Sequence, residues 1–182
     1  MLALNFTPFP ELKTGRLLLR KLERADAEEM FFLRSNENVL RYLGKEPATS
    51  IKEVEEFIDK INKAVDENES ILWGIALLND PPVIIGTICL WNLQKEHYRG
   101  EIGYLLHPGH WRKGIMKEAI NAVVDYGFND MGLHSIEASL SPENIGSSSL
   151  LESTGFVKEA HLKESFYFNG KFGDTAIYSK LK

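Results

Sequence analysis

The sequence predicts an α/β fold, in which about four helices cover a mixed, mostly antiparallel sheet of about seven strands. Two observations carry this prediction. After a first strand and two helical patterns, strand patterns follow one another as a meander. Strand and helix patterns then alternate, as strand, helix, strand, helix, strand. This order is typical of a mixed sheet with helices on both faces.

Length and composition set the class of protein. The 182 residues are the usual size of one domain, and we expect a single domain over residues 1–182. The net charge of −5 argues against binding to nucleic acid or to acidic membranes. The single cysteine, Cys89, lies in an apolar run and is expected to be a reduced core thiol. Because no signal peptide, membrane span or metal-ligand spacing is visible, we expect a cytoplasmic protein without a metal.

Two amphipathic helices are expected in the first half of the chain. The first spans 26–35 and carries acidic residues in its first turn, and the second spans 51–65. Ser50 and Glu53 form a capping-box pattern, in which the serine hydroxyl accepts a free N–H and the glutamate reaches back to the cap. The segments expected to be extended or irregular are 1–13 and 36–49.

The remaining elements are mostly strands. The first strand is expected at 16–22, and strands at 71–78 and 83–93 form a hairpin around the turn Asn79-Asp80-Pro81-Pro82. The later elements are strands at 101–106 and 134–140, a helix at 145–154 that ends at Gly155, and a final hairpin from 156–161, 166–168 and 175–181 with Asn169-Gly170 at its turn.

The segment from His107 to Phe128 is the most informative part of the chain. A strand leads through a short basic turn with two glycines into a helix, whose apolar residues recur at helical spacing. Such a turn directs free backbone N–H groups and the positive end of the helix dipole toward one point. A phosphate or pyrophosphate is the natural ligand there.

Two common phosphate motifs do not fit this segment. Gly109 and Gly114 have the spacing of a P-loop, but Ile115 stands where that motif has lysine, and no Ser or Thr follows for magnesium. The Gly-x-Gly-x-x-Gly fingerprint of dinucleotide-binding proteins is also absent. An ordinary strand-to-helix turn therefore remains an alternative on these residues alone.

A second motif favours a phosphate-binding loop over an ordinary strand-to-helix turn. Ser141 to Phe156 contains Asn144 and Ser147 as Asn-x-x-Ser, followed by Gly155-Phe156. Together with the loop Trp111-Arg112-Lys113-Gly114-Ile115-Met116, this segment resembles the GNAT superfamily of acetyl-CoA-dependent N-acyltransferases, and within it the Rim-type branch that acetylates ribosomal-protein N-termini. The resemblance extends from Thr14 to Tyr178. Met116 departs from the family pattern, which has Gly or Ala at that position.

The resemblance implies how acetyl-CoA is bound. In this family the fourth and fifth strands splay apart, and the pantetheine lies between them like an extra strand. The backbone of Leu105 and Leu106 would then bind the pantetheine amides, and the loop from Trp111 to Met116 would bind the pyrophosphate. The residues expected to bind acetyl-CoA are Leu105, Leu106, His107, Trp111, Arg112, Lys113, Gly114, Ile115, Met116, Asn144 and Ser147.

Acetyl transfer to an amine requires a neutral nucleophile. An α-amine titrates near ~8 and a lysine near ~10.4, so an N-terminal acceptor needs only a modest base. Glu101 is the first candidate because it starts the fourth strand, where related enzymes often carry Glu. Glu164, in the final hairpin, is the second. Each of them is otherwise read as a solvated carboxylate, and a backbone N–H of the splayed strand would stabilise the oxyanion.

Ser147 is the candidate partner of the sulfur. In Rim-type enzymes the serine of Asn-x-x-Ser hydrogen-bonds the thiol, whereas other branches use a tyrosine as general acid. Ser147 could instead only cap its helix or touch pantetheine, since serine favours such local bonds. Asn144 precedes the helix and can act both as N-cap and as ligand contact.

The acceptor is the least determined part of this interpretation. The resemblance favours the N-terminal α-amine of a ribosomal protein, and Phe31, Arg34 and Tyr42 are candidate acceptor contacts. One alternative is a small amine, such as an antibiotic or a polyamine. Another is a CoA-binding regulatory module without turnover. Either a monomer or a homodimer is compatible with the sequence.

Overall fold

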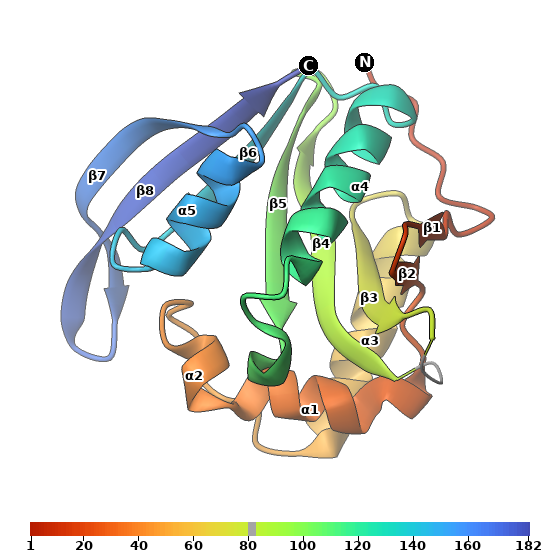
Figure 1. The fold of residues 1–182 in the computed structure, drawn as a ribbon, viewed down its shortest axis with the longest axis horizontal. Coiled ribbons are helices and arrows are strands. Elements are labelled where there is room, and N and C mark those ends of the chain that lie inside the picture. Colours follow the sequence, from red (N-terminus) through yellow and green to blue (C-terminus); the bar gives the residue numbers. More distant parts are fainter. Residues whose placement is uncertain (80–82) are drawn as a thin grey trace.

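The computed structural model describes residues 1–79 and 83–182. Its eight strands form one sheet in the order β1-β2-β3-β4-β5-β6-β8-β7 (Figure 1). Neighbouring strands are antiparallel except β5 and β6, which are parallel. The predicted mixed, mostly antiparallel sheet is therefore confirmed. The strands are β1 (Leu12–Lys13), β2 (Leu17–Arg20), β3 (Ile71–Leu77), β4 (Ile84–Gln94), β5 (Arg99–Leu106), β6 (Ser135–Leu140), β7 (Val157–Phe168) and β8 (Lys171–Leu181).

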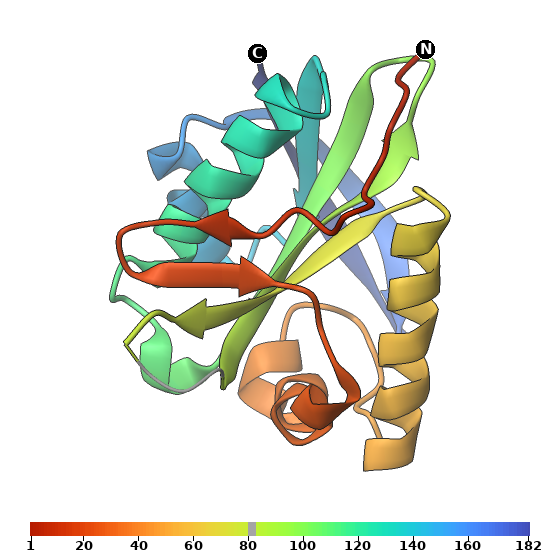
Figure 2. The ribbon, with the colours of Figure 1, turned by 90° about the vertical axis from the view of Figure 1, so that its right-hand side faces the viewer.

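The helices cover both faces of the sheet. α4 and α5 lie on one face, and α1 and α3 lie on the other (Figure 2). Within the described residues no helix is long and apolar enough to cross a membrane. The α-helices are α1 (Ala27–Ser35), α2 (Glu37–Leu40), α3 (Ile51–Asp66), α4 (Ile115–Asn129) and α5 (Ile145–Ser153).

Two apolar clusters hold these layers together. The larger lies under α4, whose Ala119, Ile120 and Val123 are fully buried together with Trp73 of β3. The smaller lies between the sheet and the helices α1 and α3, where Ile58 is fully buried. Burial of one such side chain contributes about 1.5–3 kcal/mol. The strands that form the site therefore rest on a packed core on each side.

The structure adds elements that the sequence pattern did not predict. β1 pairs two residues of the expected lead-in with β2. The expected irregular segment 36–49 contains α2, because the Asn36 side chain caps it by accepting from the N–H groups of Asn38 and Val39. Two-residue strands and one-turn helices depend on such local contacts and carry no periodicity. The counts are therefore eight strands and five α-helices along the described residues.

The predicted caps and hairpins can be compared with the structure. The Ser50 hydroxyl accepts from the Glu53 N–H at 3.2 Å as predicted, but Glu53 reaches back to Thr49, whose N–H donates to it at 2.9 Å. Asn169 and Gly170 have φ of +47° and +79° in the final hairpin. β3 and β4 form the expected hairpin. The part of its predicted turn at 80–82 lies outside the described residues.

Candidate active site

β5 and β6 separate after three paired positions, the last of which joins Glu101 to Glu137. Beyond that point β5 continues along β4, and β6 continues along β8. The two strands therefore diverge, as Figure 1 shows. We call the opening between them the splay. β5 and β6 are the strands that the sequence predicted at 101–106 and 134–140, the fourth and fifth of that prediction. Their expected separation is confirmed.

The hydrogen-bonding direction along β5 decides which backbone groups reach the splay. The His107 N–H donates to the Ile85 carbonyl across the β4–β5 pair at 2.8 Å. Because this direction alternates along a strand, the peptide groups of Leu105 face β4, whereas those of Tyr104 and Leu106 face the splay. Of the two residues expected to bind the pantetheine amides, the structure thus brings Leu106 to the opening and directs Leu105 to the neighbouring strand.

Glu101 lies where the splay begins. Its carboxylate accepts hydrogen bonds from the side chains of Asn92 on β4 and Ser139 on β6. Burial raises the pKa of Glu101 above its ordinary value, and these two hydrogen bonds and the charge of Arg99 oppose that shift only partly. A carboxylate with a raised pKa is a better proton acceptor than an ordinary glutamate.

Cys89 of β4 pairs with Gly103 of β5, close to Glu101. Gly103 follows Glu101 by two residues on the same face of β5, and a Cβ there would meet the Cys89 sulfur at 3.2 Å. Burial raises the pKa of Cys89 to about 12, and Lys45 opposes this rise while Glu101 adds to it. The Cys89 thiol therefore stays protonated at neutral pH. The Lys45 and Glu101 charges therefore both act at the Cys89 thiol.

Ser147 is bound from two directions. The Ser147 N–H donates to the Asn144 Oδ1 at 3.1 Å, so Asn144 acts as N-cap of α5. The Ser147 hydroxyl lies 2.6 Å from the Tyr104 hydroxyl. Ser147 belongs to α5 and Tyr104 to β5, so the two hydroxyl groups meet across the splay. Burial raises the pKa of Tyr104 to about 12.

The loop from Trp111 to Met116 adopts a conformation suited to an anion. Arg112 and Gly114 have φ of +59° and +73°, and the first intrahelical bond of α4 runs from the Glu118 N–H to the Gly114 carbonyl. The N–H groups of residues 115–117 therefore have no acceptor within the helix. The Trp111 indole N–H donates to the Leu106 carbonyl at 2.8 Å and fixes the loop to the end of β5.

The two apolar residues at the end of this loop do not obstruct it. The side chains of Ile115 and Met116 are 5% and 6% exposed and belong to the core under α4. Each therefore presents only its backbone N–H at the helix terminus. The departure of Met116 from the family pattern is accommodated in the core and leaves the approach to these amides free.

Arg16 is a contributor to this loop that the sequence pattern did not reveal. Its Nη1 donates to the Lys113 carbonyl at 3.0 Å, and its Nε pairs with Glu118 at 2.7 Å. Glu118 also accepts from the Thr14 hydroxyl and the Arg16 N–H. The contacts bring together residues about a hundred positions apart, so a local motif could not indicate them.

The geometry can now be compared with known proteins. The sequence profile of the acetyltransferase (GNAT) domain matches residues 16–157. The chain belongs to the GNAT acetyltransferase family. The uncharacterised N-acetyltransferase YoaA of Bacillus subtilis is 41% identical over 174 residues, which cover 96% of this chain and 98% of YoaA. This GNAT protein is an N-acetyltransferase that takes its acetyl group from acetyl-CoA.

Two solved GNAT structures show the breadth of acceptors among similar proteins. A spermidine N-acetyltransferase from Vibrio cholerae, solved with CoA and spermine, is 32% identical with a TM-score of 0.81, over 92% of this chain and 96% of that one. A ribosomal-protein-S5-alanine acetyltransferase from Vibrio fischeri is 26% identical with a TM-score of 0.81, over 94% and 96% of the two chains. Similarity to these proteins does not by itself decide the acceptor of this GNAT enzyme.

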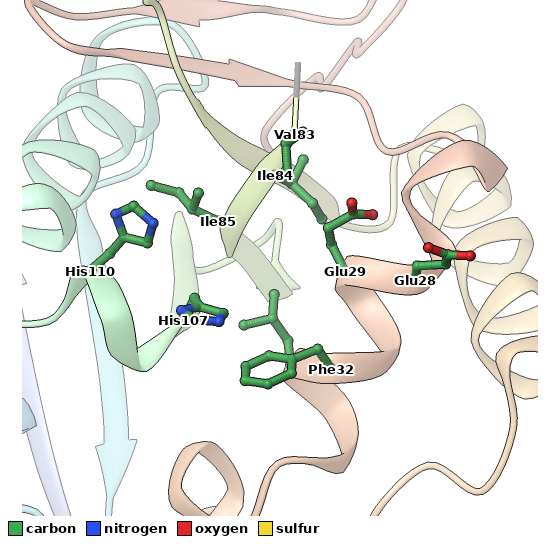
Figure 3. A pocket seen from close by; sticks show the side chains of 9 residues that line it. Glu28, Glu29, Phe32, Val83, Ile84, Ile85, His107 and His110 are labelled. Atoms are coloured by element: carbon green, nitrogen blue, oxygen red, sulfur yellow. The ribbon is translucent and has the colours of Figure 1, made fainter. Parts of the chain in front are cut away.

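His107 and His110 lie beside α1 in this GNAT fold. The His107 ring stacks on Phe32 of α1 with ring centres 4.4 Å apart, and its Nδ1 accepts from the Gly109 N–H at 3.0 Å. Both histidines line a cavity of about 370 Å³ beside α1, which Figure 3 shows together with Glu28. The structure thus gives His107 a packing role beside the loop. Three or more His, Cys, Asp or Glu side chains do not gather as metal ligands among the described residues.

The residues expected to contact the acceptor lie among less regular parts of the chain. The ring of Phe166 in β7 lies over Gly44, where a Cβ would come within 1.9 Å of it. This contact joins the β7–β8 hairpin to the segment after α2. The Arg34 guanidinium lies 3.8 Å from the centre of the Phe57 ring, and burial lowers the pKa of Arg34. Tyr42 stacks under Arg41, and Phe31 packs on the smaller core cluster.

Glu164 lies at an irregularity of β7, where the register to β8 shifts. It is exposed, with a φ of +50°, and its N–H donates to Asp174 at 2.9 Å. Asp174 also pairs with His161 at 2.6 Å. The structure therefore does not bring Glu164 into a buried environment like that of Glu101.

Proposed function

We propose that this enzyme acetylates the N-terminal α-amine of a protein, with ribosomal proteins as the leading class and the cytoplasm as its location. The single observation that carries the choice of acceptor is the charge of Lys45 close to Cys89, whose partner on β5 is two residues from Glu101. Lys45 is near enough to lower the pKa of the Cys89 thiol. A polyamine would bring a second ammonium toward this cation, whereas a peptide continues from its α-amine into neutral peptide groups.

The proposed reaction is direct attack on the thioester. Glu101, through a water molecule, accepts the proton of the α-amine, and the nitrogen attacks the acetyl carbon. A backbone N–H that faces the splay, from Tyr104 or Leu106, stabilises the oxyanion. The C–S bond then breaks, and Ser147 donates a hydrogen bond to the departing sulfur. The raised pKa of Glu101 supports its role and favours it over the exposed Glu164.

The proposed acetyl-CoA site combines the splay and the loop. The Leu106 N–H faces the splay and is available to a pantetheine amide, while Asn144 and Ser147 lie on its opposite wall. The pyrophosphate would be bound by the N–H groups at the start of α4 and by the cationic residues before it. The loop residues in this proposal are Trp111, Arg112, Lys113, Gly114, Ile115 and Met116.

A polyamine acceptor is the second candidate. The likeness to the V. cholerae spermidine N-acetyltransferase, at 32% identity, favours it. A polyamine acceptor predicts anionic side chains near its second ammonium group, whereas Lys45 is a cation. A lysine there does not exclude a short amine, so the two candidates must be separated by turnover.

The test is thiol release from acetyl-CoA with two acceptor sets. One set contains short peptides with free N-termini, and the other contains spermidine, spermine and aminoglycosides. We expect turnover with peptides and an acetyl group that fragment-ion mass spectrometry places on the α-amine. The control is the same peptides with blocked N-termini and a free lysine side chain. Turnover confined to spermidine and spermine would contradict the proposal and leave the acetyltransferase assignment intact.

A further inference from the structure

The hydrogen bond between Tyr104 and Ser147 is the contact at the splay that the proposed reaction does not yet use. The two hydroxyl oxygens are 2.6 Å apart, and the residues come from opposite walls, β5 and α5. Tyr104 packs against the core cluster under α4, so its phenol is held by its surroundings. Ser147 is held by Asn144 through its backbone. Both ends of this hydrogen bond are therefore anchored.

The chemistry of the two hydroxyl groups suggests the direction of the bond. A phenol is a stronger donor than an aliphatic hydroxyl, so the favoured arrangement has Tyr104 donating and the Ser147 oxygen accepting. The Ser147 proton is then free to point into the splay, toward the position of the thioester sulfur. Without Tyr104 the serine hydroxyl could rotate and donate to a backbone carbonyl of its own helix, as serines in helices commonly do.

We propose that Tyr104 is a positioning residue, which holds the Ser147 hydroxyl so that it donates a hydrogen bond to the sulfur of the departing CoA. This inference rests on the role proposed for Ser147. The new C–N bond forms as the C–S bond breaks, and the electron pair of that bond stays on sulfur. The proton from the amine goes to Glu101 through water, and the thiolate takes a proton from solvent after it leaves.

Tyr104 is not the source of that proton. Burial raises the pKa of its phenol to about 12. Transfer to a thiolate that titrates near 8.5 is therefore unfavourable by roughly three powers of ten. The phenol remains protonated through the working range of pH and can act only as a hydrogen-bond donor.

The first test is Tyr104→Phe, which keeps the ring and removes the hydroxyl. We expect kcat to fall about tenfold, the effect of about 1.4 kcal/mol on the barrier, with little change in KM for acetyl-CoA. In a Ser147→Ala background the same substitution should have no further effect, because Tyr104 acts through Ser147. Tyr126→Phe is the matched control, since Tyr126 is another partly buried phenol with a raised pKa, packed on Trp73 away from the splay.

The outcomes separate this inference from the proposal on which it rests. An unchanged kcat for Ser147→Ala would remove Ser147 from the reaction. A lowered kcat for Ser147→Ala with an unchanged kcat for Tyr104→Phe would overturn only the role of Tyr104. Equal losses for Tyr104→Phe in both backgrounds would show a merely structural contribution and would also overturn it. Any amine that the enzyme turns over can serve, so the result does not depend on the acceptor.

A second measurement applies if Tyr104→Phe does not fold. A fluorinated tyrosine at position 104 keeps the shape and the hydroxyl but titrates at lower pH. Because a phenolate cannot donate a hydrogen bond, the fluorinated variant should lose kcat at high pH within the range where the wild type keeps it. A kcat that follows the wild-type pH profile in the folded variant would contradict the positioning role.

Discussion

The two sides of the splay are built in different ways. The donor side consists of β5, the loop from Trp111 to Met116 and the start of α5, and it presents mainly backbone groups fixed by the core. The acceptor side consists of the segment after α2 and the β7–β8 hairpin, joined by the contact of Phe166 with Gly44. We therefore expect cofactor binding on the donor side to depend mainly on the fold, and the choice of acceptor to depend on a few exposed side chains.

The largest expected effect is on the donor side. Gly114→Val should weaken acetyl-CoA binding by more than about a hundredfold, because a β-branched residue cannot readily adopt the φ of +73° that aims the helix amides. Calorimetric titration with acetyl-CoA measures this loss. Gly170→Val is the control, since Gly170 has a φ of +79° in the distant hairpin. Equal acetyl-CoA affinity in the Gly114 variant and the wild type would refute the loop assignment.

The next effect concerns the base. Glu101→Gln should lower kcat/KM by roughly 10²–10⁴, the usual contribution of a general base. Because burial raises the pKa of Glu101 above 4.5, wild-type activity should fall, as pH drops, at a higher pH than an ordinary glutamate would give. Measurements of kcat/KM across pH for the wild type and for Glu101→Gln check this prediction. Glu164→Gln is the comparison, and a larger loss there would transfer the role of base to Glu164.

The same pKa shift predicts a stability effect of defined sign. A raised pKa in the folded state means that folding favours the protonated carboxyl, so this stabilisation is complete below the ordinary pKa. It is lost as pH rises through the raised value. Glu101→Gln should therefore unfold at an equal or higher temperature than the wild type at pH 7. A clearly lower unfolding temperature at pH 7 would contradict this reading of Glu101.

A smaller effect is expected where a side chain supports the loop. Arg16→Ala removes the donor to the Lys113 carbonyl and the partner of Glu118, and it should raise the KM for acetyl-CoA about five- to tenfold with kcat unchanged. Arg24→Ala is the matched control, because Arg24 forms an exposed ion pair with Asp59 on another part of the surface. Steady-state kinetics with varied acetyl-CoA separate the two. The same KM in both variants would deny Arg16 this function.

The smallest effect should appear on the acceptor side. Gly44→Ala places a methyl group against the Phe166 ring, so the hairpin must move. We expect the KM for the acceptor to rise by roughly threefold to tenfold, while the affinity for acetyl-CoA stays the same. The double variant with Phe166→Leu should recover part of the loss. A change in acetyl-CoA affinity instead would show that the two sides are not independent.

The sequence predicted the local structure of the donor side better than that of the acceptor side, for a physical reason. The loop around Gly114 and the cap at Asn144 are local, so residue type and spacing were sufficient to predict helix termini at both places. Fold class and most element bounds followed from periodicity in the same way. The direction of the Leu105 peptide groups was not predictable, because it depends on the register between β4 and β5.

Contacts between distant segments escaped the sequence altogether. The pairing of Tyr104 with Ser147 and of Arg16 with Glu118 spans 43 and 102 positions. Nothing in the local pattern distinguishes such a tyrosine from an ordinary core aromatic. The charge of Lys45 near Cys89 likewise depends on how the segment after α2 folds over the sheet. The acceptor therefore depends on the features that a sequence shows least.

The selection of an α-amine by the acceptor side is tested most directly by the ratio of kcat/KM for a peptide to kcat/KM for spermidine. We predict a ratio well above one in the wild type and a fall of about tenfold or more in Lys45→Glu, which reverses the charge near Cys89. Lys60→Glu is the control, because Lys60 is exposed on α3, and it should leave the ratio unchanged. A wild-type ratio below one, unaffected by Lys45→Glu, would contradict the account.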